Sequence, residues 1–287
     1  MTDTSKGLFI TSLGALVISF ESLFIKLTTI EPLVFSFYIG IFMFFATAAM
    51  LLLKKKKISV EILMPSFKYA LLGAFLMAIS NLFFIAAIKN TLVANVVLIL
   101  ATAPLFASFF AFLFYKVRPR KNIYIASFFI FIGLYIIFSE QVGLGDLSGN
   151  IYALICAILF SLSFVLLARY PQFDRVLLIC ISGIILSILA FFLASGINID
   201  IKNLIVVMIM GLLITPISRV LIGNGTKYIS ASEVSLLMII ETIMAPIWVW
   251  IFLKEIPSSY TFIGGSIILL TLIINALYNL RKKEIQL

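Results

Sequence analysis

The chain contains 287 residues, of which 63% are hydrophobic and only 11% are charged. A soluble domain of this length does not need so much apolar surface, so the composition excludes a soluble enzyme or binding domain. The net charge of +9 does not indicate nucleic-acid binding, because the basic residues stand in short clusters between apolar runs. We interpret the chain as an all-α integral membrane protein.

About ten apolar runs are long enough to cross a hydrocarbon core roughly 30 Å thick. The connections between them are short and leave no room for a nucleotide-binding domain, so any active transport is ion- or exchange-driven or depends on a separate subunit. The predicted spans are Gly7–Leu27, Pro32–Leu53, Phe67–Ile88, Thr91–Tyr115, Asn122–Ser139, Gly149–Ala168, Arg175–Ala194, Leu204–Ile222, Ala231–Leu253 and Tyr260–Leu280. The first begins so close to the N-terminus, without a small-residue cleavage site, that we expect a retained helix rather than a signal peptide.

Lysine and arginine predict the orientation of these spans. Alternate connections and the two ends of the chain hold most of them, namely Lys6, Lys54–Lys57, Lys68, Lys116, Arg118, Arg120, Lys121, Arg169, Arg175, Lys227 and Arg281 to Lys283. The opposite side holds only Lys26, Lys89, Lys202 and Lys254. Basic loops stay in the cytoplasm, so we expect both termini there and the protein in the inner or plasma membrane.

The chain repeats itself. When the chain is aligned with its own second half, one constant shift superposes Gly73 on Gly211, Lys116 on Lys254 and Pro119 on Pro257. Each half, 1–140 and 148–287, contains five predicted spans, and this odd number requires the halves to be inverted relative to one another. Inverted repeats are typical of secondary transporters, whose sites lie near the middle of the membrane where the repeats meet.

Two stretches resemble a known family. The run IKNTLVANVVLILATAPLFASFFAFLFYKVRP resembles the fourth-helix signature of the drug/metabolite transporter superfamily, EamA type, and TKYISASEVSLLMIIETIMAPIWVWIFLKEIPSSYTFIGGSIIL resembles its ninth- and tenth-helix counterpart. The chain departs from the family where Thr242 follows Glu241 instead of proline, and where Tyr115-Lys116 replaces the usual Gly-Glu; the second half keeps Glu255. The resemblance implies a central cavity lined mainly by the first, third, fourth, sixth, eighth and ninth helices.

Four polar residues lie well inside spans of this cavity-lining type: Glu21, Asn81, Arg219 and Glu241. The shift that superposes Gly73 on Gly211 also superposes Asn81 on Arg219, so these two occupy matched places in the two repeats. Arginine offers a planar fork of donors suited to a carboxylate or phosphate. The alternatives are a structural ion pair with either glutamate, or a side chain that snorkels to the cytoplasmic face. Burial disfavours the charged form of a carboxyl group and a nearby arginine favours it, so a glutamate held between them can carry a proton during transport.

Residues at helical spacing extend the predicted substrate-binding set. Thr215 shares a face with Arg219, and Asn95 shares one with Thr102. Ser163 is the counterpart of Glu21 under the slightly larger shift that superposes Gly7 on Gly149, and Trp248 continues the stripe that begins at Glu241. The position of Trp248 is also typical of an interfacial aromatic belt.

Three functions remain open. The first is a secondary transporter that exports amino acids or similar small polar metabolites, with protons as the candidate coupling ion. The second is a flippase for lipids or lipid head groups. A membrane-embedded enzyme is disfavoured, because the chain has no histidine and its two cysteines, Cys156 and Cys180, are expected to be small core residues. We therefore expect no cofactor and no metal, contact with membrane lipid, and a monomer or a weak homodimer.

Overall fold

A computed structural model describes residues 3–53, 66–116, 121–142, 147–170, 172–225, 228–229 and 231–284. These parts of the chain contain helices and no strand, which confirms the all-α prediction. Nine helical segments within them are long and apolar enough to cross a membrane, and a tenth contains the shorter apolar helix Ile239–Leu253. The predicted basic residues at 54–57, 118, 120 and 227 lie outside the description, as do the side chains of Lys121, Arg281, Lys282 and Lys283.

Four of the ten spans consist of more than one helix. In chain order the spans are α1 (Asp3–Ile18) with α2 (Glu21–Leu27), α3 (Pro32–Leu53), α5 (Phe67–Asn90), α6 (Val93–Leu100) with α7 (Ala103–Tyr115), α8 (Lys121–Val142), α9 (Ser148–Ala168), α10 (Arg175–Leu193), α11 (Ile201–Ile209) with the π-helix η1 (Met210–Ile214) and α12 (Thr215–Gly225), α13 (Ala231–Leu237) with α14 (Ile239–Leu253), and α15 (Ser259–Glu284).

Three of the breaks have a local cause. Pro104 stands in the first turn of α7, where its missing N–H is tolerated, and so separates α7 from α6. Pro216 explains the π-helix η1 that precedes it, because proline has no N–H to donate to the preceding turn. At the first break the Ser19 hydroxyl donates to the Leu16 carbonyl oxygen at 2.6 Å and competes with the helical pattern. The break at Met238 lies two turns before Pro246, so proline does not explain it.

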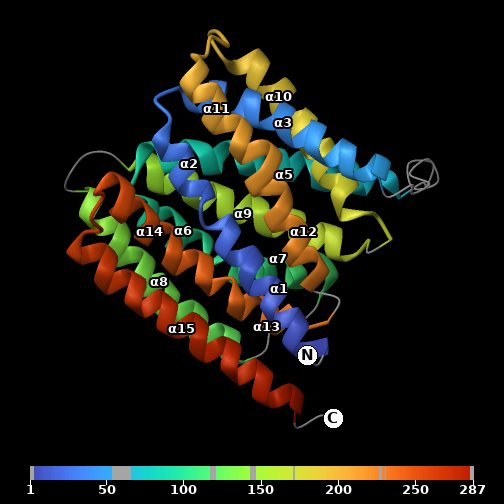
Figure 1. Ribbon diagram of the computed structural model, residues 1–287. Coiled ribbons are helices and arrows are strands. Elements are labelled where there is room, and N and C mark those ends of the chain that lie inside the picture. The colour runs from blue at the N-terminus through green and yellow to red at the C-terminus, as the bar shows by residue number, and fades with distance from the viewer. Residues whose placement is uncertain are drawn as a thin grey trace.

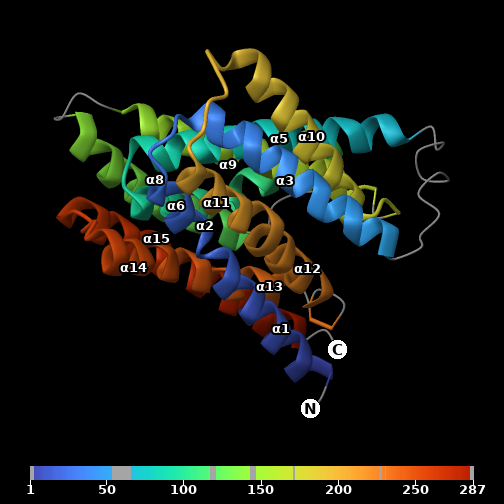
Figure 2. The same cartoon turned by 45° about the horizontal axis from the view of Figure 1, so that its top comes forward.

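The packing of the helices follows the internal repeat. The first span packs on the eighth (α1 on α12) and the third on the sixth (α5 on α9), and the repeat exchanges these two contacts. The second and seventh spans (α3, α10) and the fifth and tenth (α8, α15), each a pair of repeat counterparts, pack on one another. An approximate two-fold axis between the halves produces this pattern. Figures 1 and 2 place the start of α1 and the end of α15 at the same end of the bundle.

Two details confirm the close match between the repeats. Lys116 and Lys254 end α7 and α14 with φ angles of 57° and 58°, the left-handed conformation that glycine adopts most easily. At the contact between α3 and α10, a Cβ added to Gly40 would lie 2.6 Å from the carbonyl oxygen of Gly183, so these backbones approach as closely as glycine permits. Cys156 and Cys180 are both buried, as predicted for core residues.

Candidate substrate cavity

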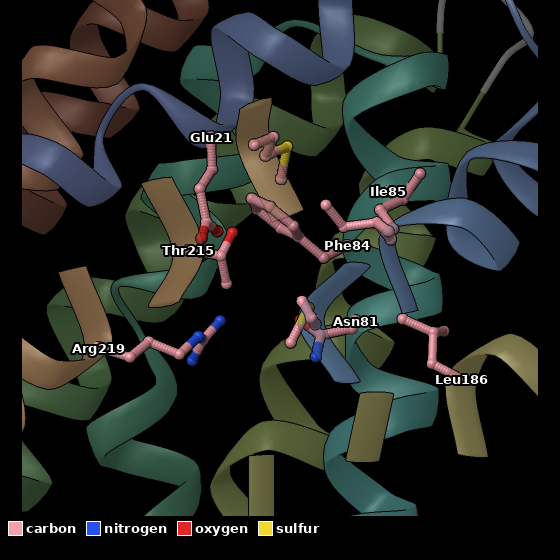
Figure 3. A pocket seen from close by; sticks show the side chains of 10 residues that line it. Glu21, Asn81, Phe84, Ile85, Leu186, Thr215 and Arg219 are labelled. Atoms are coloured by element: carbon pink, nitrogen blue, oxygen red, sulfur yellow. The ribbon is translucent and has the colours of Figure 1, made fainter. Parts of the chain in front are cut away.

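A small cavity lies at mid-span between five of the spans (Figure 3). It encloses about 270 Å³ of empty space including its mouth, but the side chains leave room for roughly one water molecule. The lining contains four polar or charged residues and an apolar wall. Its members are Glu21, Ile39, Met43, Asn81, Phe84, Ile85, Leu186, Met210, Thr215 and Arg219.

The irregular points of two spans bring Glu21 and Thr215 together. Glu21 is the first residue of α2, immediately after the break that follows α1, and Thr215 is the first residue of α12 after η1. The two spans run antiparallel, with Gly14 against Ile222. Glu21 follows Gly14 by the same number of residues by which Thr215 precedes Ile222, so this antiparallel register places Glu21 opposite Thr215. Both residues line the cavity, and Figure 3 shows them on the same side of it, across from Asn81 and Leu186.

Several polar atoms of the lining are buried without a hydrogen-bond partner among the described residues. They are Oε1 of Glu21, Oγ1 of Thr215 and Nε of Arg219. Glu21 is 6% exposed and Thr215 is 3% exposed, so bulk water does not replace the missing partners. An unsatisfied buried polar group costs about 1–3 kcal/mol, and native proteins keep few of them. Three of the seven such side-chain atoms among the described residues line this one cavity, where a polar ligand or a water molecule would supply the missing partners.

Arg219 and Asn81 face the same space from opposite sides. Arg219 extends from α12 and Asn81 from α5, which are equivalent helices in the two repeats. In Figure 3 the guanidinium group points into the gap that separates it from the Asn81 amide. The matched pair therefore gives the cavity one cationic wall and one neutral wall, so the ends of a bound molecule meet different surroundings.

Glu241 lies next to this cluster without being part of the lining. It is half-buried on α14, and its carboxyl group interacts electrostatically with Glu21 and Arg219. Among the described side chains, no ion pair within 4.0 Å joins Arg219 to either glutamate. The charges of the cavity thus influence one another without neutralising one another in direct contact.

Three other predicted residues lie elsewhere and make hydrogen bonds there, although the buried amide nitrogen of Asn95 has no partner among the described residues. Asn95 accepts a hydrogen bond from the Thr261 hydroxyl at 2.6 Å, between α6 and α15. The Thr102 hydroxyl donates to the Ile99 carbonyl oxygen at 2.6 Å, and that of Ser163 donates to the Gly73 carbonyl oxygen at 3.1 Å. The cavity does not include them, so their predicted contact with substrate stays a prediction for another conformation.

Trp248 packs inside the bundle, against the break in the first span. Its indole N–H donates to the Ser19 hydroxyl at 2.9 Å, and its ring stacks on Phe20 with centroids 4.6 Å apart. Trp250, two residues later, is 53% exposed, as expected for an interfacial belt. Trp248 therefore supports the position of Glu21, which follows Phe20 in the chain.

Sequence reasoning missed the apolar half of the lining. Ile39 and Met43 come from α3 and Leu186 from α10, whereas the helices that the resemblance implied as the main lining do not include the second and seventh. In the cavity described here, the fourth, sixth and ninth spans contribute no residue. An apolar residue among many others carries no signal of its own, so only the packing of the spans identifies these three. No group of three or more potential metal-binding side chains occurs among the described residues.

Comparison with known proteins places the chain among transporters. The model of the EamA-like transporter family matches twice, over residues 5–139 and 144–277. The uncharacterized transporter YdfC of Bacillus subtilis (strain 168) is 29% identical over 178 residues, which cover 58% of this chain and 57% of that protein. One crystal structure aligns with a TM-score of 0.68 at 17% identity, covering 96% of this chain and 98% of the other, and supports the fold.

Proposed function

The chain belongs to the EamA-like transporter family, and from this we propose that it is a secondary transporter for small zwitterionic metabolites such as amino acids. One observation carries the proposal. Charged and polar atoms of Glu21, Thr215 and Arg219 are buried without partners around a single mid-span cavity. A zwitterion would supply partners of both signs.

The chemistry of the lining supports a defined orientation of this substrate. The guanidinium group of Arg219 suits a carboxylate, to which it can donate two parallel hydrogen bonds. Glu21 suits an ammonium group, and the Thr215 hydroxyl can accept or donate beside it. Met43, Phe84 and the other apolar residues of the wall favour a substrate whose third substituent is apolar or small.

We further propose export from the cytoplasm across the inner or plasma membrane, with both termini in the cytoplasm. The basic clusters between alternate spans support this orientation. The halves 1–140 and 148–287 would act as the two repeats between which access alternates. Glu21 and Glu241 are the candidate proton carriers, because they are the acidic side chains at or beside the cavity.

A thermal-shift panel on the purified protein tests this function. Amino acids, nucleosides, sugars and polyamines are added separately, and a ligand at about 100 times its dissociation constant stabilises by roughly 2.7 kcal/mol. We expect a shift with one or more amino acids that disappears in Arg219→Ala. The control Arg169→Ala removes an arginine that lies over the Tyr115 ring, away from the cavity, and should keep the shift.

The same panel decides between the proposed substrate class and a lipid. A stabilisation by lipid head groups alone, equal in the Arg219→Ala and unaltered proteins, would contradict the proposal and favour a flippase.

A further inference from the structure

The contacts between two groups of helices differ at the two ends of the bundle. We call α5, α6, α7 and α9 the α5 group, and α1, α2, α11, η1, α12, α13 and α14 the α1 group; the repeat exchanges them. At the end that holds Lys26, α6 packs on α14 and α2 packs on α5. Their counterparts at the opposite end would be α13 on α7 and α12 on α9, and the described residues make no comparable contact there. In the part of the chain that the structure describes, the groups are therefore closed on one another at the Lys26 end and not at the opposite end.

Polar contacts between the two groups show the same asymmetry. Lys26 donates to the Thr91 carbonyl oxygen at 3.0 Å, and Lys89 donates to the Thr28 hydroxyl at 2.8 Å and to its carbonyl oxygen. The Val93 backbone N–H donates to Oε1 of Glu255 at 2.6 Å. All of these contacts connect the α1 group with the α5 group at the Lys26 end.

At the opposite end, none of the described aromatic contacts connects the α5 group with the α1 group. Arg169 lies over the Tyr115 ring at 5.6 Å and Tyr69 stacks on Tyr170 at 5.1 Å, within or next to the α5 group. Lys6 lies over the Tyr228 ring at 5.3 Å, next to the α1 group. These contacts stabilise each group without holding the two together.

The carboxylate of Glu255 organises the closed end. It forms an ion pair with Lys26 at 2.8 Å, with both side chains about four-fifths buried (20% and 18% exposed). Its other oxygen accepts from Val93 at the start of α6, a helix that has no side-chain cap of its own. An anion at a helix N-terminus is stabilised by the helix dipole. Glu255 thus connects the end of α14 to the first turn of α6.

The other repeat has no equivalent of this acid. The shift that superposes Lys116 on Lys254 also superposes Val117 on Glu255. An identical ion pair therefore cannot form at the opposite end when the groups close there, so the two closed states differ in energy.

We propose that Lys26, Lys89 and Glu255, with the backbone at Thr28, Thr91 and Val93, form a latch that holds the Lys26 end of the cavity closed and must release for transport. With the orientation proposed above, the latch is the outer gate, and the conformation described here faces the cytoplasm. The assignment of the latch to the outer side of the membrane rests on the proposed function. The existence of the latch rests only on the contacts described above.

The charges predict an unequal effect of removing each partner. The positive charges of Lys26 and Lys89 lie close enough to act on one another, and they belong to opposite groups. Removing Glu255 takes away the attraction and leaves this repulsion, whereas removing Lys26 takes away both. Glu255→Gln should therefore open the latch more than Lys26→Gln, and the double variant should resemble Lys26→Gln.

Spin-label distances in lipid nanodiscs test the latch without any substrate. One label pair, at Asn90 and Ile256, reports the Lys26 end, and a second pair, at Phe9 and Phe114, reports the opposite end. The native cysteines are both buried and so react little. In Glu255→Gln we expect the ratio of open to closed populations at the first pair to rise on the order of tenfold, with a shorter distance at the second pair.

Glu31→Gln and Lys202→Gln are matched controls at the same end of the spans, since both residues are exposed; Glu31 lies in the connection between α2 and α3, and Lys202 lies in the first turn of α11. They should leave both distance distributions unchanged. Latch variants that behave like these controls, a first distance that lengthens while the second stays fixed, or additive effects in the double variant would each overturn the proposal. Normal latch release combined with no ligand in the thermal-shift panel would instead count against the proposed function alone.

Discussion

Replacing Thr215 by valine should stabilise the ligand-free protein. The hydroxyl is 3% exposed and has no hydrogen-bond partner among the described residues, so its desolvation is uncompensated. Valine has nearly the same shape and removes this cost, which is about 1–3 kcal/mol for a buried unsatisfied group. Relaxation of the cavity and a trapped water molecule would reduce the gain, so we expect about 1 kcal/mol.

Thermal unfolding in detergent measures the effect, and Thr47→Val is its matched control. Thr47 is 2% exposed, but its hydroxyl donates to the Met43 carbonyl oxygen at 2.6 Å. Its replacement should lower the melting temperature, because a hydrogen bond worth about 0.5–1.5 kcal/mol is lost. For a chain of this size, about 1 kcal/mol corresponds to a shift of roughly 2 °C, upwards for Thr215→Val and downwards for Thr47→Val.

Substrate should stabilise the Thr215→Val variant less than it stabilises the unaltered protein. If the hydroxyl contacts substrate, Thr215→Val reduces the ligand-induced shift although it raises the ligand-free melting temperature. A melting temperature that falls in Thr215→Val by as much as in Thr47→Val would refute the reasoning, because it would mean that the Thr215 hydroxyl already has a partner in the ligand-free protein.

Three further predictions concern charge. Arg219→Lys should weaken ligand binding at least tenfold in titrations, because an ammonium group cannot donate the paired hydrogen bonds of a guanidinium group. Glu21→Gln should abolish the dependence of liposome transport on an imposed pH gradient if Glu21 carries the proton; full dependence in both Glu21→Gln and Glu241→Gln would exclude both. Asp200 precedes α11, and hydrogen bonds from the side chain and backbone of Asn203 hold its pKa below the usual value. Its stabilising effect is therefore present above about pH 4 and lost below, so Asp200→Ala should lower the melting temperature at pH 7 but not in strong acid.

The sequence was sufficient to predict the spans and the charged part of the cavity. Apolar runs of spanning length have few alternatives, and a charged or amide side chain inside such a run is costly enough to mark a polar interior. This reasoning found Glu21, Asn81 and Arg219, and all three line the cavity. The predicted role in substrate binding still awaits the ligand experiments.

For residues such as Asn95, Thr102 and Ser163, the same reasoning does not predict whether the side chain faces the cavity or a neighbouring helix. Helical spacing tells which residues share a face, but both a cavity and a neighbouring helix accept a small polar side chain. The Ser163 hydroxyl reaches a carbonyl oxygen on α5, and that of Thr102 bonds within its own span. Only the rotation of each helix against its neighbours decides between these outcomes, and one sequence does not specify that rotation.

The position of the cavity follows from where the spans are interrupted. Each interruption removes regular backbone hydrogen bonds, which is tolerated at membrane depth only inside protein or beside water. The break before Glu21 and the π-helix before Thr215 face one another because their spans pack antiparallel. The two interruptions thus bring Glu21 and Thr215 to the cavity, and they also weaken both spans at the same depth in the membrane. A span interrupted there can bend between its halves, which is the movement that release of the proposed latch at the Lys26 end would require.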